Sequence, residues 1–211
     1  MDDFFNYVLY SRRRRRRRAR RHSKRYKLLV SASLVCFLVL VTYLAFQFSP
    51  VERDYMYPFP YRKIVERYAA YYHVDSTMVA AVIKTESSFR DNACSHRGAL
   101  GLMQIMPSTG AWIAEQLEDK AYSEDKLTEP ERNIHYGVWY LHSLEQEFHG
   151  NPVLVLAAYN AGRGNVRDWI EKRGWDMNFH DVDAIPFPET KRYVKQVMET
   201  QKKYNDLYPE E

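Results

Sequence analysis

The sequence contains few of the residues that build metal sites and disulfide frameworks. Only two cysteines, Cys36 and Cys94, occur among 211 residues, which excludes a disulfide-stabilised scaffold and a zinc site built on cysteines. The seven histidines form no H-x-x-x-H pair and the carboxylates are not clustered like metal ligands, so we expect no metal and no other cofactor. The sequence also lacks strong alternation of polar and apolar residues and internal repeats, which leaves a mostly helical fold.

The composition is that of a globular protein with unevenly distributed charge. Hydrophobic residues make up 45% and charged residues 27% of the chain, which excludes a disordered or collagen-like protein. The formal net charge is +4, yet residues 1–27 contain 12 Lys and Arg against two Asp. The remainder, with 19 Lys and Arg and 25 Asp and Glu, therefore carries a net charge of −6. A mildly acidic domain thus follows a basic arm, and we expect no nucleic acid as its partner.

One long hydrophobic run follows the basic arm. Residues 28–48 carry no charge, and a helix of this length would measure about 30 Å, the thickness of a bilayer hydrocarbon core. The run has no polar stripe, which a buried core helix would have, and this predicts an uncleaved transmembrane anchor. A cleaved signal peptide is the alternative, although the run is long for one and ends in bulky residues. A lipoprotein signal at Cys36 is a weaker alternative, because the bulky Val35 precedes the cysteine.

The basic arm, residues 1–27, determines the expected orientation. It contains an unbroken arginine run from Arg12 to Arg18, and such charge stays on the cytoplasmic side of a membrane. We therefore expect a single-pass protein of the inner (cytoplasmic) membrane, with a cytoplasmic N-terminus and residues 50–211 in the periplasm. Anionic lipid headgroups are the expected partner of the arm, with RNA as a weaker alternative. Cys94 would then be separated from Cys36 and remain a free, partly buried thiol.

The remaining sequence predicts a linker at residues 49–60 and one mainly helical domain at residues 61–211, which is large enough to bury a core without disulfides. Residues 88–106 contain glycines and leave room for a short hairpin. Helical spacing and capping residues predict seven helices. Four of them cover residues 61–72, 107–117, 130–148 and 188–204. One is capped by Asp75 and runs to about Glu86, and another is capped by Asn165 and ends near Gly174. The seventh starts at Asn151-Pro152 and is stopped by Gly162.

Four segments contain polar residues that could carry chemistry. Glu86 ends an otherwise apolar helix in the segment K-T-E-S-S-F. Gln104 lies in G-A-L-G-L-M-Q-I-M-P, where glycines allow tight turns and close approach to a ligand. The third segment is A-A-Y-N-A-G, with Tyr159 and Asn160, and the fourth is I-P-F-P-E-T-K-R-Y-V, with Glu189. Taken singly, each has an ordinary structural explanation, such as a helix cap or a solvated helix end.

The order of these four segments resembles that of the lytic transglycosylases of the soluble-lytic-transglycosylase type, over about residues 61–204. The resemblance implies a mainly α (α+β), lysozyme-like fold and a lyase that cleaves the glycan strands of peptidoglycan. Gly110 and Arg163 depart from the family pattern, which often has Ala and Pro there, and leave the geometry of the adjacent loops open. Carried over by position, the implied roles are catalysis for Glu86, substrate binding for Ser95, Gln104, Met106, Tyr159, Asn160 and Glu189, and support for Ser87 and Tyr193.

The resemblance also implies a mechanism with one carboxylate, whereas ordinary glycosidases use two. Glu86 would protonate the bridging oxygen and then, as a carboxylate, accept the proton of the sugar's own 6-hydroxyl, which closes a 1,6-anhydro ring. This requires the pKa of Glu86 to rise from about 4.3 towards 6–7, and burial against apolar walls would raise it. The expected wall residues are Phe89, Met103, Met106 and Tyr159.

Other functions remain open at this point. A peptidoglycan hydrolase (muramidase) would use Glu189 or an aspartate to activate water, and would produce reducing ends instead of anhydro ends. A non-catalytic glycan-binding module would keep the fold without turnover. An adaptor would use the basic arm to bind a cytoplasmic partner, although nothing in the sequence identifies protein partners.

Overall fold

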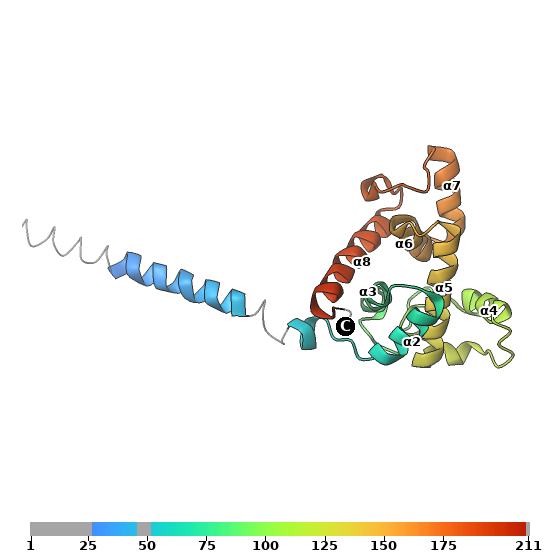
Figure 1. The fold of residues 1–211 in the computed structure, drawn as a ribbon, viewed down its shortest axis with the longest axis horizontal. Coiled ribbons are helices and arrows are strands. Elements are labelled where there is room, and N and C mark those ends of the chain that lie inside the picture. The colour runs from blue at the N-terminus through green and yellow to red at the C-terminus, as the bar shows by residue number, and fades with distance from the viewer. Residues whose placement is uncertain (1–26, 46–51, 210–211) are drawn as a thin grey trace, which may run out of the picture. The chain divides into compact units, whose positions relative to one another are not determined.

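The structure is a computed structural model that describes residues 27–45 and 52–209 (Figure 1). The chain divides into two compact units, Met1–Met56 and Tyr57–Glu211. The basic arm up to residue 26 lies outside the described residues, as do residues 46–51, where the expected anchor ends and the expected linker begins. The orientation of the anchor therefore remains a prediction.

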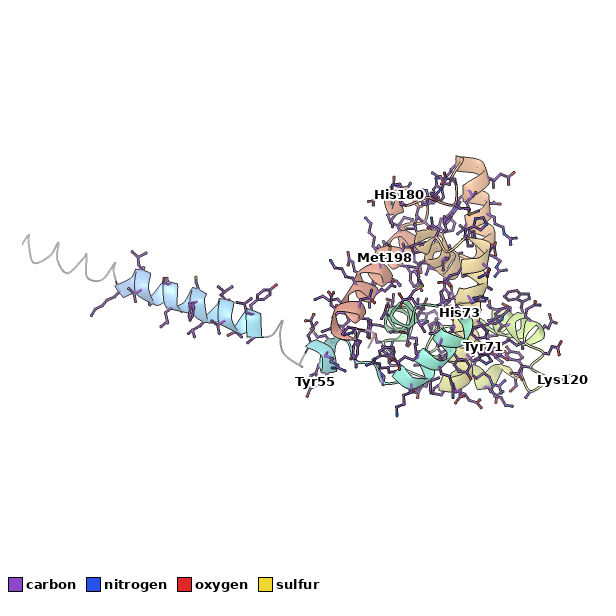
Figure 2. All side chains as sticks on the ribbon, in the orientation of Figure 1. Tyr55, Tyr71, His73, Lys120, His180 and Met198 are labelled. Atoms are coloured by element: carbon purple, nitrogen blue, oxygen red, sulfur yellow. The ribbon has the colours of Figure 1, made fainter. Side chains whose placement is uncertain are left out.

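The first unit contains a long apolar helix, Lys27–Ala45. Its 19 residues have a mean hydropathy of 2.5, and none of the apolar stretch is buried. Figure 2 shows side chains that project from the helix along its whole length. The hydroxyls of Ser31 and Thr42 donate to the carbonyls of Leu28 and Leu38 at 2.9 and 2.8 Å, which satisfies them inside the helix. By length and composition this helix could cross a membrane; a signal sequence would have the same properties.

The second unit consists of helices joined by short loops, and residues 52–209 include no β-strand. The expected mainly helical fold class is thus confirmed. A π-helical turn, η1 (Glu52–Met56), belongs to the end of the first unit and lies within the expected linker. The helices that follow are α2 (Arg62–Tyr72), α3 (Ser76–Ser87), α4 (Pro107–Gln116), η2 (Glu124–Thr128), α5 (Pro130–Glu147), α6 (Pro152–Ala161), α7 (Arg163–Arg173), η3 (Val182–Ala184) and α8 (Pro188–Leu207).

Local sequence signals determine where most of these helices begin. The Asp75 side chain accepts hydrogen bonds from the backbone N–H groups of Thr77 and Met78 at 2.7 and 3.2 Å, so it caps α3 as expected. Asn151 caps α6 in the same way. Proline is the first residue of α4, α5, α6 and α8, where its fixed φ suits the helix and its missing N–H has no intrahelical partner to lose.

The start of α7 differs from the prediction. The sequence predicts a cap at Asn165, but α7 begins at Arg163, so Asn165 lies in its first turn. The Asn165 side chain instead donates a hydrogen bond to the Ala161 carbonyl at 2.7 Å. Gly162 has a φ of +90°, which lets α7 follow α6 directly with a change of direction. Arg163 is therefore the first residue of a helix and does not belong to a loop.

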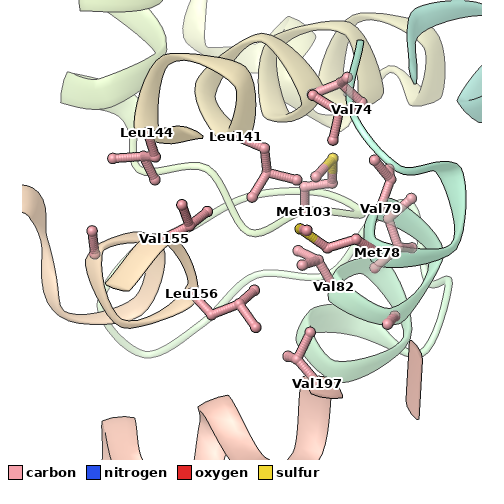
Figure 3. Packing of buried hydrophobic residues seen from close by; sticks show 14 of the residues in the cluster. Val74, Met78, Val79, Val82, Met103, Leu141, Leu144, Val155, Leu156 and Val197 are labelled. Carbon is pink, nitrogen blue, oxygen red and sulfur yellow. The ribbon is translucent and has the colours of Figure 1, made fainter. Parts of the chain in front are cut away.

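The apolar core surrounds α3, in which every residue from Met78 to Ile83 is buried. α3 packs against α2 and α8, and α6 contacts both α5 and α8 (Figure 1). Side chains of α3, α5, α6 and α8 form one buried cluster with Met103, which comes from the loop before α4 (Figure 3). One continuous core thus holds the C-terminal ends of α3 and α6 and the start of α8 in fixed relative positions.

The loop at residues 88–106 contains no strand, although the sequence leaves room for a hairpin. It contains two isolated antiparallel bridges, between Cys94 and Leu100 and between Leu100 and Ile105. Cys94 is a free thiol, but it is exposed and not partly buried as expected, because it lies in this surface loop. Two bridges that share Leu100 are too few to form a ladder, so the loop needs support from elsewhere in the domain.

Asn133 of α5, which is fully buried, provides that support. Its side-chain oxygen accepts from the Met103 N–H at 2.7 Å, and its amide donates to the carbonyls of Leu100 and Leu127 at 2.9 and 2.6 Å. Gly101, with a φ of +76°, is required beside it, because a Cβ there would lie 2.3 Å from the Asn133 amide nitrogen. The sequence signal is a lone amide next to apolar residues on the inner face of a helix, and our sequence analysis missed it.

Replacement of Asn133 by alanine is expected to lower the free energy of unfolding by about 2 kcal/mol, because buried backbone groups of the loop would lose their partners. Chemical denaturation of the full chain in detergent, followed by circular dichroism, measures this. Asn165→Ala is the control, since Asn165 is exposed and makes one hydrogen bond to the backbone. Equal stability of the two variants would contradict the supporting role of Asn133.

Candidate active site

Glu86 is the next-to-last residue of α3, at the point where this buried helix emerges from the core. Its side chain is only partly exposed, unlike that of Ser88, which is exposed. The buried Ser87 hydroxyl donates to the Ile83 carbonyl at 3.2 Å, so the residue expected to support the site is bonded within its own helix. A rigid helix end therefore positions the Glu86 carboxyl group.

Burial raises the pKa of the Glu86 carboxyl from 4.5 to about 7, because removal from water disfavours the charged form. The Tyr193 hydroxyl opposes this shift to a smaller extent by interacting with the carboxylate. That interaction does not have the geometry of an ordinary hydrogen bond, since among the described residues the buried Tyr193 hydroxyl has no hydrogen-bond partner. A carboxyl group with such a pKa can donate and accept a proton near neutral pH.

Two tyrosines from different helices lie near this carboxyl group. Tyr159, near the end of α6, donates its hydroxyl hydrogen to the Met103 carbonyl at 2.8 Å. Tyr193 lies in the second turn of α8 and is buried. Burial and the nearby Glu86 raise the pKa of both tyrosines well above 10, so both hydroxyls keep their protons. Three helices thus bring one carboxyl and two hydroxyl groups together.

The backbone beside Glu86 is strained. Ser88 and Phe89 have φ values of 52° and 61°, and Gln104 has 48°, in the left-handed region that residues other than glycine rarely adopt. Such strain is concentrated at functional sites, where the surrounding structure maintains it. The Phe89 ring packs against Tyr204 of α8, with centroids 6.5 Å apart, so the residue expected as a wall for Glu86 also joins an aromatic cluster.

Gln104 and Ser95, which are expected to bind the glycan, use part of their hydrogen-bonding capacity inside the loop before α4. The Gln104 amide donates to the carbonyls of Ala93 and Gly101 at 3.2 and 2.9 Å. The Ser95 hydroxyl oxygen accepts from the Ala99 N–H at 2.9 Å. These bonds leave the Gln104 side-chain oxygen and the Ser95 hydroxyl hydrogen to be offered to a ligand from fixed positions.

The two methionines of this loop differ in exposure. Met103 is fully buried and packs against Gly137 of α5, where an added Cβ would lie 2.2 Å from its sulfur. Met106, the residue before α4, is 38% exposed, so its side chain is accessible to a ligand as expected for a substrate-binding residue. Gly110, one departure from the family pattern, is closely packed, because an added Cβ would lie 3.0 Å from the Leu127 side chain.

A polar pocket of about 390 Å³ lies where α6 ends and α8 begins. Within it, the Asn160 side-chain oxygen accepts from the Thr190 hydroxyl at 2.8 Å, which joins the two helices. The exposed carboxylate of Glu189 lies 3.9 Å from the exposed guanidinium of Arg97, an ion pair that contributes little stability. The structure thus brings the predicted residues Asn160 and Glu189 into one pocket. Its lining consists of Arg97, Asn160, Ala161, Asn165, Phe187, Pro188, Glu189 and Thr190.

A second pocket, of about 320 Å³, adjoins Tyr159 and is called the Arg163 pocket here. Tyr140 of α5 lines it, and its ring centroid lies 5.5 Å from that of Tyr159. From the sequence, Arg163 was recognised only as a departure from the family pattern, and the aromatic residues at the surfaces of α4 and α5 were the signal that could have pointed to this pocket. The lining residues are Ser108, Thr109, Trp112, Tyr140 and Arg163. In residues 27–45 and 52–209, no group of three or more His, Cys, Asp or Glu side chains could hold a metal ion.

Known proteins are similar to this chain in sequence. The chain is 35% identical over 144 residues to the soluble lytic murein transglycosylase of Escherichia coli K12, covering 67% of this chain and 22% of that protein. It is 34% identical over 168 residues to the membrane-bound lytic murein transglycosylase C of Edwardsiella ictaluri, covering 70% of this chain and 47% of that protein. The chain thus spans about a fifth of the length of the first relative and about half of the second.

Solved structures give the same result. The 70 kDa soluble lytic transglycosylase of Escherichia coli superposes with a TM-score of 0.69 at 33% identity, over 73% of this chain and 25% of that chain. An inactive mutant of the lytic transglycosylase Slt from Pseudomonas aeruginosa superposes with a TM-score of 0.65 at 33% identity, over 72% and 25%. The transglycosylase SLT domain matches residues 63–181. Because this match covers more than half of the chain, the chain belongs to the transglycosylase SLT domain family.

Proposed function

We propose that this chain is a membrane-anchored lytic transglycosylase that cleaves the β-1,4 bond between N-acetylmuramic acid and N-acetylglucosamine in peptidoglycan without consuming water. The product would be a strand with a 1,6-anhydromuramic acid end. The observation that carries the proposal is the buried Glu86, whose pKa is raised to about 7 beside Tyr159 and Tyr193.

In the first step, the protonated Glu86 donates its proton to the glycosidic oxygen, and the bond from that oxygen to the anomeric carbon of N-acetylmuramic acid breaks. The oxygen of the N-acetyl group on the same sugar stabilises the cationic centre. In the second step, the 6-hydroxyl of that sugar attacks the anomeric carbon, and Glu86, now a carboxylate, accepts its proton. Glu86 is then protonated again, so one group with a pKa near the working pH serves as acid and as base.

The neighbouring groups have positioning roles in this scheme. Tyr159 ties the end of α6 to the Met103 carbonyl, and so keeps the loop with Gln104 at a fixed distance from Glu86. The Tyr193 hydroxyl, which keeps its proton, stabilises the carboxylate form after the first transfer. Asn160 and Glu189 line the adjoining pocket and would contact the glycan there.

The names of the relatives support this proposal. The relatives in Escherichia coli and Edwardsiella ictaluri are named lytic murein transglycosylases. The mutant of Slt described as inactive carries glutamine in place of a glutamate, and the 70 kDa soluble enzyme has been solved in complex with bulgecin A. Glu189 and Tyr193 lie beyond the matched residues 63–181, so their assignment depends on the geometry of α8.

We also propose that residues 28–48 anchor the catalytic domain, residues 61–211, to the inner membrane, with the basic arm in the cytoplasm and the domain in the periplasm. The exposed apolar helix Lys27–Ala45 supports the anchor, as does the similarity to a relative named membrane-bound. Anionic lipid headgroups would bind the arm, whose charge lies next to the apolar run in the sequence.

Incubation of the full chain, in detergent micelles, with purified peptidoglycan is expected to release muropeptides that end in 1,6-anhydromuramic acid. Mass spectrometry detects these products, because each is lighter by one water molecule than the corresponding reducing sugar. Products with reducing ends would identify a muramidase and contradict the proposed mechanism. Binding without any release would identify a glycan-binding module.

A further inference from the structure

The Arg163 pocket (Ser108, Thr109, Trp112, Tyr140 and Arg163) contains a cation in a fixed position. The Arg163 guanidinium lies over the Trp112 ring, with its carbon 4.8 Å from the centroid, and 5.6 Å from the centroid of Tyr140. One of its terminal nitrogens donates to the Ser143 hydroxyl at 3.0 Å. Stacking and hydrogen bonding thus restrict a side chain that would otherwise be flexible.

The charge of Arg163 is not fully compensated. Its closest carboxylate, Glu147 of α5, lies 3.4 Å away, but the same carboxylate pairs with Arg167 at 2.5 Å. Two guanidinium groups therefore share one carboxylate, which leaves a net positive charge. The five residues that line the pocket include no carboxylate, and Ser108 and Thr109 add hydroxyl groups at its wall.

Two tyrosine rings connect the pocket with the proposed reaction site. Tyr140 lines the pocket and contacts the ring of Tyr159, and Tyr159 is an electrostatic neighbour of Glu86. A substituent on a sugar bound at Glu86 could therefore extend towards Arg163. The guanidinium has five N–H groups, and its contacts with Ser143, Glu147 and the Tyr140 hydroxyl occupy three of them, so two donors remain for a ligand.

We propose that the Arg163 pocket binds a carboxylate that belongs to the muramic acid part of the substrate, and that Arg163 thereby makes the enzyme prefer charged glycan strands over neutral ones. This inference rests on the proposed function for the identity of the substrate. The carboxylate has two sources, the peptide stem or, where the stem has been removed, the lactyl group of muramic acid. A planar guanidinium with free donors suits a carboxylate in either case.

The test measures binding, so that it does not depend on turnover. Isothermal titration of the full chain carrying Glu86→Gln, in detergent micelles, uses three soluble tetrasaccharides. The first has peptide stems, the second has free lactyl carboxylates after stem removal, and the third is neutral chitotetraose. Introducing Arg163→Gln as a second substitution is expected to weaken binding of a carboxylated ligand about tenfold, or about 1.4 kcal/mol. The affinity for chitotetraose is expected to stay the same.

The first two ligands distinguish the two sources of the carboxylate. A loss of affinity for the first ligand identifies the stem carboxylates, and a loss of affinity for the second identifies the lactyl carboxylate. Arg173→Gln is the matched control, since Arg173 is an exposed residue of the same helix that neither lines the pocket nor pairs with Glu147, and it is expected to change no affinity. Equal losses for all three ligands, or no loss for any of them, would overturn the inference.

A second measurement covers the case in which Arg163→Gln fails to fold. With Arg163 present, affinity for the carboxylated ligand is expected to fall as salt concentration rises, whereas affinity for chitotetraose stays constant. The same salt response for both ligands would overturn the inference. If the wild-type chain binds carboxylated ligands selectively but releases no anhydro products, the proposed reaction is refuted, whereas carboxylate binding by the Arg163 pocket is still supported.

Discussion

Glutamine in place of Glu86 is expected to lower kcat for peptidoglycan cleavage by a factor of about 10²–10⁴, the usual contribution of a general acid–base group. The substitution preserves the size of the side chain and removes its transferable proton. Tyr159 and Tyr193 cannot replace it, because burial keeps their pKa values well above 10. Release of soluble muropeptides by the full chain in detergent measures the rate.

Two other glutamates serve as controls for this result. Glu199→Gln alters an exposed residue of α8 and is expected to leave kcat unchanged. Glu189→Gln alters the polar pocket at the start of α8 and is expected mainly to raise KM. Wild-type kcat in a folded Glu86→Gln variant would exclude Glu86 as the acid and base. A loss of kcat for Glu189→Gln as large as that for Glu86→Gln would favour the muramidase alternative.

The pH dependence of stability is the second large effect expected from Glu86. Its pKa is about 7 in the folded protein against 4.5 as the ordinary value, so the folded state binds more protons than the unfolded state between these pH values. Glu86 therefore stabilises the fold fully below pH 4.5, and this contribution is lost as pH rises through about 7. The loss amounts to about 3 kcal/mol, at 1.36 kcal/mol for each pH unit between the two values.

Comparison with Glu86→Gln isolates this contribution, because the other titrating groups are common to both proteins. The free energy of unfolding, measured by denaturation across the range from acid to mildly alkaline pH, is expected to fall more steeply with pH in the wild type. Glu199→Gln should follow the wild type. A difference between wild type and Glu86→Gln that stays constant with pH would show that the carboxyl is not buried in its neutral form. The cleavage rate should decline above about pH 7 for the same reason, as the acid loses its proton.

Helix boundaries were largely predictable because they depend on neighbouring residues. Asp75 caps α3, and prolines begin α4, α5, α6 and α8, through contacts that reach only a few residues along the chain. The start of α7 was mispredicted, because Gly162 allows a helix to follow α6 without the Asn cap that the pattern suggested. Residues 88–106, where the sequence left room for a short hairpin, form only two isolated bridges, and an amide from α5, Asn133, holds that loop.

The sequence by itself determined the helical domain, the apolar run before it, and the order of motifs that placed the chain in its family, because these features depend on local composition and spacing. Tertiary structure alone decided that Glu86 lies beside Tyr159 and Tyr193, which are 73 and 107 residues further along the chain, and that Arg163 faces Trp112 and Tyr140. The physical reason is that the pKa of a carboxyl group and the charge of a pocket depend on burial and on neighbours in space, which only the packing of α3, α5, α6 and α8 brings together.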